Sequence, residues 1–271
     1  MAGGEAQVAP IEIRQLFHLE EFDSIFEMQK TIWSYAESEL IPMRFLAVVA
    51  KVGGHVFGAY DGPRMIGFCF AIPGIKPDGR PYLHSHMLGV LPAYRNAQIG
   101  RRLKLRQRDD ALARGIALIE WTFDPLELKN AFLNIEKLGA IVRVYQENQY
   151  GTTTSPLHGG LPTDRCTAEW WIDSPRVHSI LGGAVGQALS PANSWSRSRL
   201  AGGPRGYPAC PTERISYPAD IAVIREQASD RARQIQQSNA RLFLDAFSRG
   251  LAVTGFARTA TVGAYLLEPW P

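Results

Sequence analysis

The most informative stretch of the sequence for predicting the fold is LGVLPAYRNAQIGRRLKLRQR, at residues 88–108. An apolar strand pattern ends at Val90, a short turn follows, and a helix is predicted over residues 99–114. The free N–H groups and the dipole at the start of a helix favour an anion, and Gly100 has no Cβ to keep a phosphate from the backbone. Six basic residues crowd the segment: Arg95, Arg101, Arg102, Lys104, Arg106 and Arg108. The segment therefore predicts a binding site for a pyrophosphate-bearing ligand.

A solvated basic helix is the alternative interpretation of the same residues. The GxGxxG dinucleotide pattern and the GxxxxGK[ST] phosphate loop are both absent from the chain. Their absence argues against the Rossmann and nucleotide triphosphatase classes.

The elements predicted around this segment alternate between strands and helices. Strands are expected at 11–17, 55–60, 64–72, 82–90, 116–123, 142–146 and 167–173, and helices at 19–33, 42–53, 99–114 and 124–138. Strands that begin as hairpins and then alternate with helices predict an α/β (α+β) protein with a mixed sheet.

Composition limits the classes of function. The chain has 271 residues with 45% hydrophobic and 20% charged residues, enough for a core and against wholesale disorder. A net charge of +3 gives no strong case for nucleic acid or an anionic membrane. Three widely spaced cysteines form neither a disulfide framework nor a CxxC metal pattern, and the first ten residues have no signal-peptide pattern. We expect a cytoplasmic protein without a membrane span.

The C-terminal third differs from the rest in composition. Residues 174–212 are rich in Gly, Ser and Pro and predict a linker, with one short helix near 176–189. Residues 218–250 predict one long amphipathic helix, and 251–256 and 261–268 a hairpin. The predicted organisation is a tail at 1–10, a domain at 11–173, a linker at 174–212 and an extension at 213–271. The extension packs on the domain or forms a homodimer interface.

The quoted segment resembles the acetyl-coenzyme-A loop of the GNAT N-acetyltransferase superfamily, V-x-P-x-x-R-x-x-G-x-G/A followed by a helix. Val90, Pro92, Arg95 and Gly100 match that pattern, and Gln98 replaces its first glycine. KLGA at 137–140 is similar to the family's K-x-G-F ending, so the resemblance covers residues 11–173. More narrowly, WTFDPLELKNAFLNIEKLGA, YQENQYG and TDRCTAEWW resemble a subgroup of uncharacterised, predicted acetyltransferases.

The resemblance implies a mostly antiparallel central sheet flanked by helices, and acetyl-CoA or another acyl-CoA as cofactor. The implied cofactor contacts are Leu88, Gly89 and Val90 for pantetheine and Gln98, Ile99, Gly100, Arg101 and Arg102 for pyrophosphate, with Arg95 and Arg101 as side-chain partners. Asn130 and Asn134, one helical turn apart, are further candidates for the pantetheine amide or the substrate.

Acyl transfer to an amine needs a base and an acid. Alternation along the strand 82–90 places His84, His86 and Leu88 on one face, which makes His86 the first candidate base and His84 the second. A structural histidine and a zinc-binding His-x-His pair are the alternatives. The family's usual acid, a tyrosine, is replaced by Ile135, so Tyr145 or Tyr150 is the substitute.

Two further residues are candidates for binding the acceptor substrate. Asp124, at the end of a strand, suits an ammonium group, although an Asp before a proline is also a common helix cap. Arg165 suits a carboxylate, with a surface ion pair as the alternative. Trp170 and Trp171 alternate in direction, and core packing is the simpler interpretation of both.

The sequence thus predicts an acyl-CoA-dependent N-acyltransferase acting on an amine of a small molecule or a protein. A non-catalytic acyl-CoA-binding or regulatory protein is the alternative, given the missing tyrosine and the replaced glycine. A nucleic-acid binder using the basic helix is a third class, disfavoured by the overall charge.

Overall fold

The computed structural model describes residues 10–151, 153–155, 158–182 and 213–270. The chain divides into two compact units, Met1–Arg114 and Gly115–Pro271. The predicted domain at 11–173 is therefore shared between the two units, and its boundaries stay a prediction. Each unit is described by itself below.

The first unit contains four strands in the order β1-β2-β3-β4, and each neighbouring pair is antiparallel. The strands are β1 (Glu12–Gln15), β2 (His55–Asp61), β3 (Arg64–Ile75) and β4 (Pro81–Val90). All four were predicted from alternation, with ends that differ by up to three residues.

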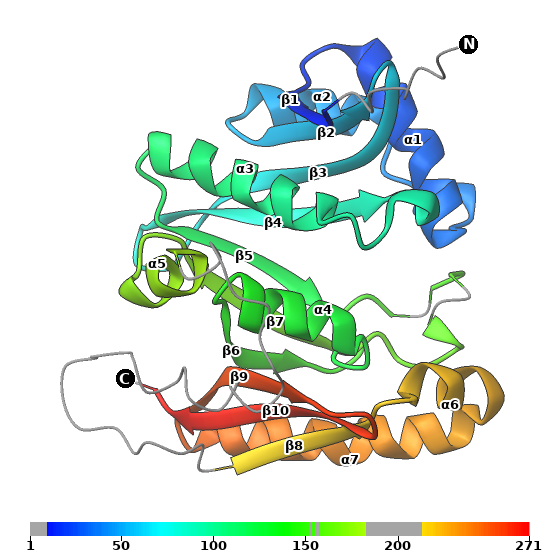
Figure 1. Ribbon diagram of the computed structural model, residues 1–271, viewed down its shortest axis with the longest axis vertical. Helices are drawn as coiled ribbons and strands as arrows, with labels where there is room; N and C mark the ends of the chain where they lie inside the picture. Colours follow the sequence, from blue (N-terminus) through cyan, green and yellow to red (C-terminus); the bar gives the residue numbers. More distant parts are fainter. Residues whose placement is uncertain (1–9, 152, 156–157, 183–212, 271) are drawn as a thin grey trace, which may run out of the picture. The chain divides into compact units, whose positions relative to one another are not determined.

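Helices cover both faces of this sheet (Figure 1). On one face, α1 (Leu19–Trp33) and α2 (Met43–Lys51) bury a core with β2, β3 and β4. On the other face, α3 (Ile99–Ala113) packs Ile99 and Leu103 on the sheet. Single turns at Glu37–Glu39 and Pro92–Tyr94 complete the unit.

A β-bulge in β4 changes which side chains share a face. Met87 pairs with Phe70 and Ser85 with Ala71, so His86 is the extra residue, opposed by no residue of β3. Leu88 therefore packs with α3, whereas Met87 packs with α1 and α2. The prediction that Leu88 shares a face with His84 and His86 was wrong, because strict alternation does not survive a bulge.

The second unit contains six strands in the order β5-β7-β6-β9-β10-β8, with antiparallel pairing throughout. Their bounds are β5 (Leu118–Phe123), β6 (Ile141–Gln146), β7 (Arg165–Trp171), β8 (Glu213–Pro218), β9 (Leu251–Arg258) and β10 (Val262–Pro269). Strand β8 was not predicted. The C-terminal hairpin joins the sheet where Val253 of β9 pairs with Val142 of β6.

Within the described residues of the second unit, five helical segments accompany the sheet (Figure 1). They are α4 (Leu128–Phe132), a π-helical segment η3 (Leu133–Lys137), α5 (Pro175–Gly182), α6 (Ile221–Gln227) and α7 (Ser229–Ser248). The helix predicted from residue 124 begins at Leu128, because Asp124 first forms a turn in which its carboxylate accepts the Leu126 N–H at 2.8 Å. Most of the predicted linker, and the end of its helix, lies outside the described residues.

The predicted long helix at 218–250 is two helices. Ala228 leaves the helical region with φ −146° and ψ 65°, between α6 and α7. Each helix has its own anchors on the unit: Arg225 of α6 binds Asp124 and Glu127, and Gln236 of α7 donates to the Pro162 carbonyl at 2.9 Å. A one-residue break leaves the apolar periodicity nearly unchanged, so the sequence pattern did not reveal it.

The C-terminal elements supply part of the core of the second unit. Phe243 of α7 stacks on Tyr145 with ring centroids 5.1 Å apart and meets Tyr265 of β10 edge-on at 5.2 Å. The Tyr265 hydroxyl donates to the Pro125 carbonyl at 2.7 Å. Trp170 is fully buried, as core packing requires, and donates to the Leu138 carbonyl at 2.6 Å, whereas Trp171 is half-buried. Helix α7 and the hairpin therefore pack on this unit's own sheet.

Within the described residues, no helix combines the length and apolar character that crossing a bilayer requires.

Candidate functional site

The start of α3 is an open helix N-terminus in the first unit. Gln98 adopts a left-handed conformation with φ 59° and offers no side-chain cap, so the chain turns sharply into the helix. The bond from the Arg102 N–H to the Gln98 carbonyl, at 3.0 Å, is the first of the helix. The N–H groups of Ile99, Gly100 and Arg101 precede that bond and point out of the helix end.

Gly100 keeps this site accessible. A Cβ at that position would meet only the Leu88 side chain, at 3.4 Å, so the space next to the backbone is otherwise open. Arg95 is exposed and Arg101 half-buried, and within the described residues neither forms an ion pair with a carboxylate. Two guanidinium groups and a helix N-terminus fit a pyrophosphate.

Three of the six basic residues in the segment have other roles. Lys104 is buried, and its ammonium group donates to Ser85 Oγ at 2.8 Å, while burial lowers its pKa to about 7. Arg102 donates to the Ile11 carbonyl at 2.6 Å, and Arg106 lies over the Phe57 ring at 5.0 Å. The expectation that Lys104 belongs to the phosphate site was wrong, because its helix face turns inward onto β4.

The left-handed Gln98 leads to a first prediction. We expect Gln98→Gly to leave the free energy of unfolding nearly unchanged, because relief of the left-handed backbone is offset by a more flexible unfolded chain. Gln98→Val should lose about 1–2 kcal/mol, since a β-branched residue tolerates this region poorly. Urea unfolding of both variants measures the difference. Equal stability of the two would show that residue 98 is not left-handed.

The two histidines of β4 lie side by side on the face that α1 and α2 cover. Their ring centroids are 5.8 Å apart, and His86 lies 5.4 Å from Phe70 of the core below those helices. Desolvation and the neighbouring His86 lower the pKa of His84 to about 4, and desolvation also lowers the pKa of His86. Both imidazoles are therefore neutral at physiological pH, and His86, which is exposed, is the accessible one.

The two asparagines do not present a shared surface. Asn130 is exposed in α4, whereas Asn134 is 4% exposed in the π-helical segment. The change from α to π winding between them alters the one-turn spacing that the sequence predicted. Ile135, at the position of the family's tyrosine, is fully buried.

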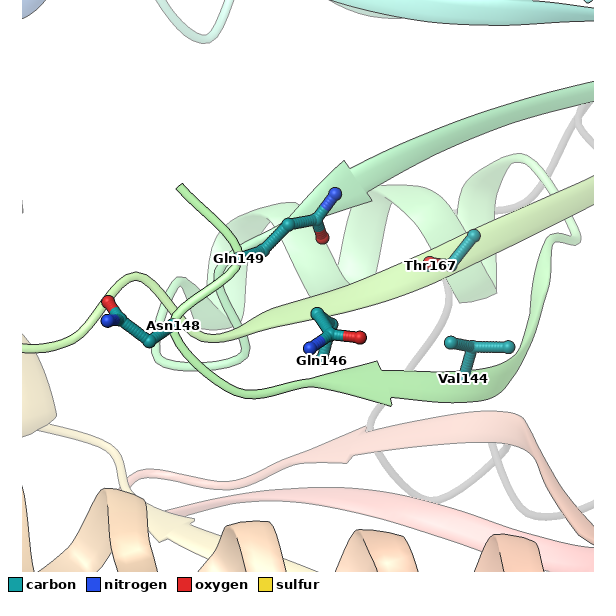
Figure 2. Close-up of a pocket in the computed structure, with 5 residues that line it drawn as sticks. All are labelled: Val144, Gln146, Asn148, Gln149 and Thr167. Carbon is teal, nitrogen blue, oxygen red and sulfur yellow. The ribbon is translucent and has the colours of Figure 1, made fainter. Parts of the chain in front are cut away.

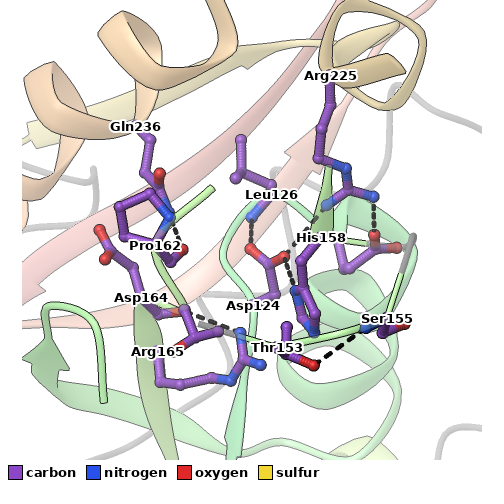
Figure 3. Close-up of polar contacts among 12 residues, drawn as sticks. Asp124, Leu126, Thr153, Ser155, His158, Pro162, Asp164, Arg165, Arg225 and Gln236 are labelled. Atoms are coloured by element: carbon purple, nitrogen blue, oxygen red, sulfur yellow. Dashed lines mark hydrogen bonds and ion pairs between the residues drawn. The ribbon is translucent and has the colours of Figure 1, made fainter. Parts of the chain in front are cut away.

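In the second unit, Asp124 lies in a network of polar contacts that Figure 3 shows. Its Oδ2 lies 3.2 Å from Arg225 and 3.9 Å from Nδ1 of His158. Arg225 also contacts Glu127 at 2.6 Å. Burial raises the pKa of Asp124 to about 6, against the opposing charges of Arg165 and Arg225. Asp124 therefore serves as turn cap and ion-pair partner at once, and no sequence pattern pointed to Arg225 as its partner.

The two candidate acids differ in access. The Tyr145 hydroxyl donates to Asp164 at 2.7 Å inside the core, and burial raises the pKa of this phenol. Tyr150 is 49% exposed, and its hydroxyl lies 2.9 Å from Thr122 Oγ1 of β5. The acid role of Tyr145 remains a prediction, and its burial and its bond to Asp164 do not favour that role. Tyr150 is the accessible phenol of the two.

An open pocket of about 340 Å³ lies on the β6–β7 side of the same unit. Its lining consists of Val144, Gln146, Asn148, Gln149 and Thr167 (Figure 2). Arg165 is half-buried, donates to the Asp164 carbonyl at 3.0 Å, and lies over the Tyr150 ring at 5.4 Å. Among the described residues, no three or more His, Cys, Asp or Glu side chains gather in a way that could hold a metal ion.

The fold is that of an α/β protein with a mostly antiparallel sheet flanked by helices. A strand, a sharp turn and a helix with an open, arginine-flanked N-terminus follow one another in it. Residues 19–138 match the model of the acetyltransferase (GNAT) family. The chain therefore contains a segment that matches the GNAT acetyltransferase family.

One solved structure supports the same fold at 16% sequence identity. Protein yncA of Salmonella typhimurium, solved with its cofactor acetyl-CoA, has a TM-score of 0.50 and 16% identity, over 60% of this chain and 95% of that one. The ribosomal-protein-S18-alanine N-acetyltransferase of Escherichia coli has a TM-score of 0.48 and 17% identity, over 67% and 99%. No curated protein matches the sequence.

Proposed function

We propose that this protein is an acyl-CoA-dependent N-acyltransferase that transfers acetyl from acetyl-CoA to an amine of a small molecule or a protein. The observation that carries the proposal is the open anion site at the start of α3, where Gly100 leaves the backbone accessible. The family match and the fold that this chain shares with an acetyl-CoA-bound structure support the same cofactor.

In this proposal, the cofactor is held by the chain's backbone and two arginines. Amides from Gln98, Ile99, Gly100 and Arg101 bind the pyrophosphate, with Arg95 and Arg101 as side-chain partners. The amide of Arg102, which the resemblance also implied, already donates to the Gln98 carbonyl at 3.0 Å. The backbone of Leu88, Gly89 and Val90 binds the pantetheine arm. Gly89 is tightly enclosed, since a Cβ there would lie 2.8 Å from Ile32 and Trp33 of α1. The thioester supplies an activated acyl carbon for attack by the amine.

His86 is the proposed base. An amine must lose a proton to attack the thioester carbon, and a neutral imidazole accepts it. The pKa of His86 is lowered by desolvation, which keeps the side chain in its proton-accepting form at neutral pH. His84, with a pKa of about 4, is too weak a base for this task. Acetyl-CoA would supply the activated acyl group, the amide would form as the C–S bond breaks, and the released thiolate would take a proton from solvent.

This assignment gives a prediction for turnover. We expect His86→Gln to lower kcat by about 100-fold to 1,000-fold while the affinity for acetyl-CoA stays the same, as for removal of a general base. His84→Gln is the matched control on the same strand and should lower kcat much less. Thiol release with a panel of amines measures kcat, and a thermal shift measures binding. Equal losses for the two variants would remove His86 from the base role.

A non-catalytic acyl-CoA-binding protein is the second candidate function. The buried Ile135 favours it, because that position has no proton to donate. Thiol release separates the candidates: a protein that binds acetyl-CoA and releases no thiol with any amine is a binding module.

A further inference from the structure

We propose that Arg165 binds a carboxylate group of the acceptor, whose remaining part occupies the neighbouring pocket of β6 and β7. The role of this ligand as the acyl acceptor rests on the proposed function, whereas the carboxylate site rests on the geometry of the second unit alone.

Strand register places Arg165 at the edge of the pocket. Arg165 pairs directly with Gln146 of β6, which lines the pocket, and directly opposed residues of a sheet project to the same face. Thr167, two residues along β7, shares that face and lines the pocket as well. Thr167 pairs with Thr122 of β5, whose hydroxyl lies 2.9 Å from the Tyr150 hydroxyl. Arg165, the pocket and Tyr150 therefore form one continuous surface.

The charge of Arg165 is not matched by an ion pair. Among the described residues, no carboxylate lies within ion-pair distance of its guanidinium group. One N–H donates to the Asp164 carbonyl, and the Tyr150 ring lies 5.4 Å from the guanidinium carbon. These two contacts fix the group in place and occupy one of its five N–H donors. A fixed, half-buried guanidinium with free donors matches the two oxygens of a carboxylate.

The surroundings favour a carboxylate over a phosphate. The pocket lining is uncharged, with three carboxamides, a hydroxyl and a valine. Arg143, next to the lining residue Val144, is a second cation at this surface, but it is paired with Glu169 at 2.5 Å. Among the described residues, Arg165 is therefore the cation of this surface that has no ion-pair partner, and Glu147 is exposed beside the lining residue Gln146.

Arg165 also lies close enough to Asp124 to act against the rise in the pKa of that buried carboxyl, so the positive charge left for a ligand is at most one. Such a site suits a monoanion, whereas a phosphate dianion would meet an excess of negative charge. Carboxamides supply both donors and acceptors for amide or hydroxyl groups next to the carboxylate.

Ligand-observed NMR on the full chain without acetyl-CoA tests the site. The probes are amine-free carboxylates, N-acetylglycine and hippurate, each paired with its uncharged primary carboxamide. We expect each carboxylate to bind about tenfold more tightly than its carboxamide, as for a hydrogen-bonded charge. Arg165→Gln should abolish that preference. Arg258→Gln, which removes an exposed arginine of β9, is the matched control and should retain it.

Three outcomes overturn the carboxylate site: no binding of either carboxylate, equal binding of acid and amide, or a preference that persists in Arg165→Gln. Thermal shift with acetyl-CoA and thiol release report on the acyltransferase proposal separately. Loss of those signals with an intact carboxylate preference would reject the acyltransferase and keep the site.

Discussion

Gly100→Glu should abolish acetyl-CoA binding. The new carboxylate lies where the pyrophosphate binds, and like charges at close range cost about 3 kcal/mol or more. We expect the affinity to fall by more than about 100-fold, so that the thermal shift of the wild-type protein disappears. Retained binding would mean that the cofactor does not use the start of α3.

The same substitution is expected to leave the fold intact, which makes the result interpretable. An acidic side chain in the first turn of a helix is favourable toward the helix dipole. Gly100→Ala is the matched control, because a Cβ at that position has only an ordinary contact of 3.4 Å with Leu88. The alanine variant should bind acetyl-CoA, and both variants should unfold at a urea concentration close to that of the wild type.

Arg225→Ala should destabilise the second unit by about 3 kcal/mol at pH 8, because it leaves the buried Asp124 without its closest cation. The side chains of Arg225 and Asp124 are only 9% and 10% exposed, so water cannot replace the lost charge. Urea unfolding measures the loss. Arg249→Ala, which breaks an exposed ion pair with Glu213, is the control and should have a far smaller effect.

The loss should depend on pH in a defined direction. The pKa of Asp124 is about 6 in the folded protein against a model value of 3.8, so the folded state holds this proton more tightly than the unfolded chain. The stability that protonation confers is complete below pH 3.8 and is lost as the pH rises through 6. Removing Arg225 raises the pKa further, so Arg225→Ala should lose less stability at pH 5 than at pH 8. An equal loss at both pH values would show that Asp124 is not the group left unpaired.

A double variant identifies the source of the loss. Arg225→Ala with Asp124→Asn removes both charges, and it should regain most of the stability at pH 8. A double variant as unstable as Arg225→Ala would assign the loss to packing of the arginine stem or to Glu127.

Local pattern was sufficient for most of the elements. Alternation predicted the strands of the first unit, and apolar spacing predicted α1, α2 and α3 within two residues. The strand–turn–helix order with Gly100 also predicted where the N-terminus of α3 lies, and a helix N-terminus has free N–H groups wherever the helix packs.

Predictions that depended on side-chain direction were less successful. The bulge at His86 reverses the alternation that placed Leu88 beside the histidines. Lys104 has the charge of a phosphate ligand but lies on the buried face of α3, where it contacts Ser85. Such directions follow from register and helix docking, which composition does not encode.

From the sequence alone, the resemblance to the acetyltransferase family and the order of most elements could be predicted, because both depend on residues close together in the chain. Three features follow only from the tertiary structure. Arg225 binds the carboxylate of Asp124 from 101 residues away, and α6, the helix that contains Arg225, ends before Ala228. Arg165 lies beside Gln146 and Tyr150. These are contacts between distant segments, and their energy comes from burial and charge pairing that exist only once the chain has folded.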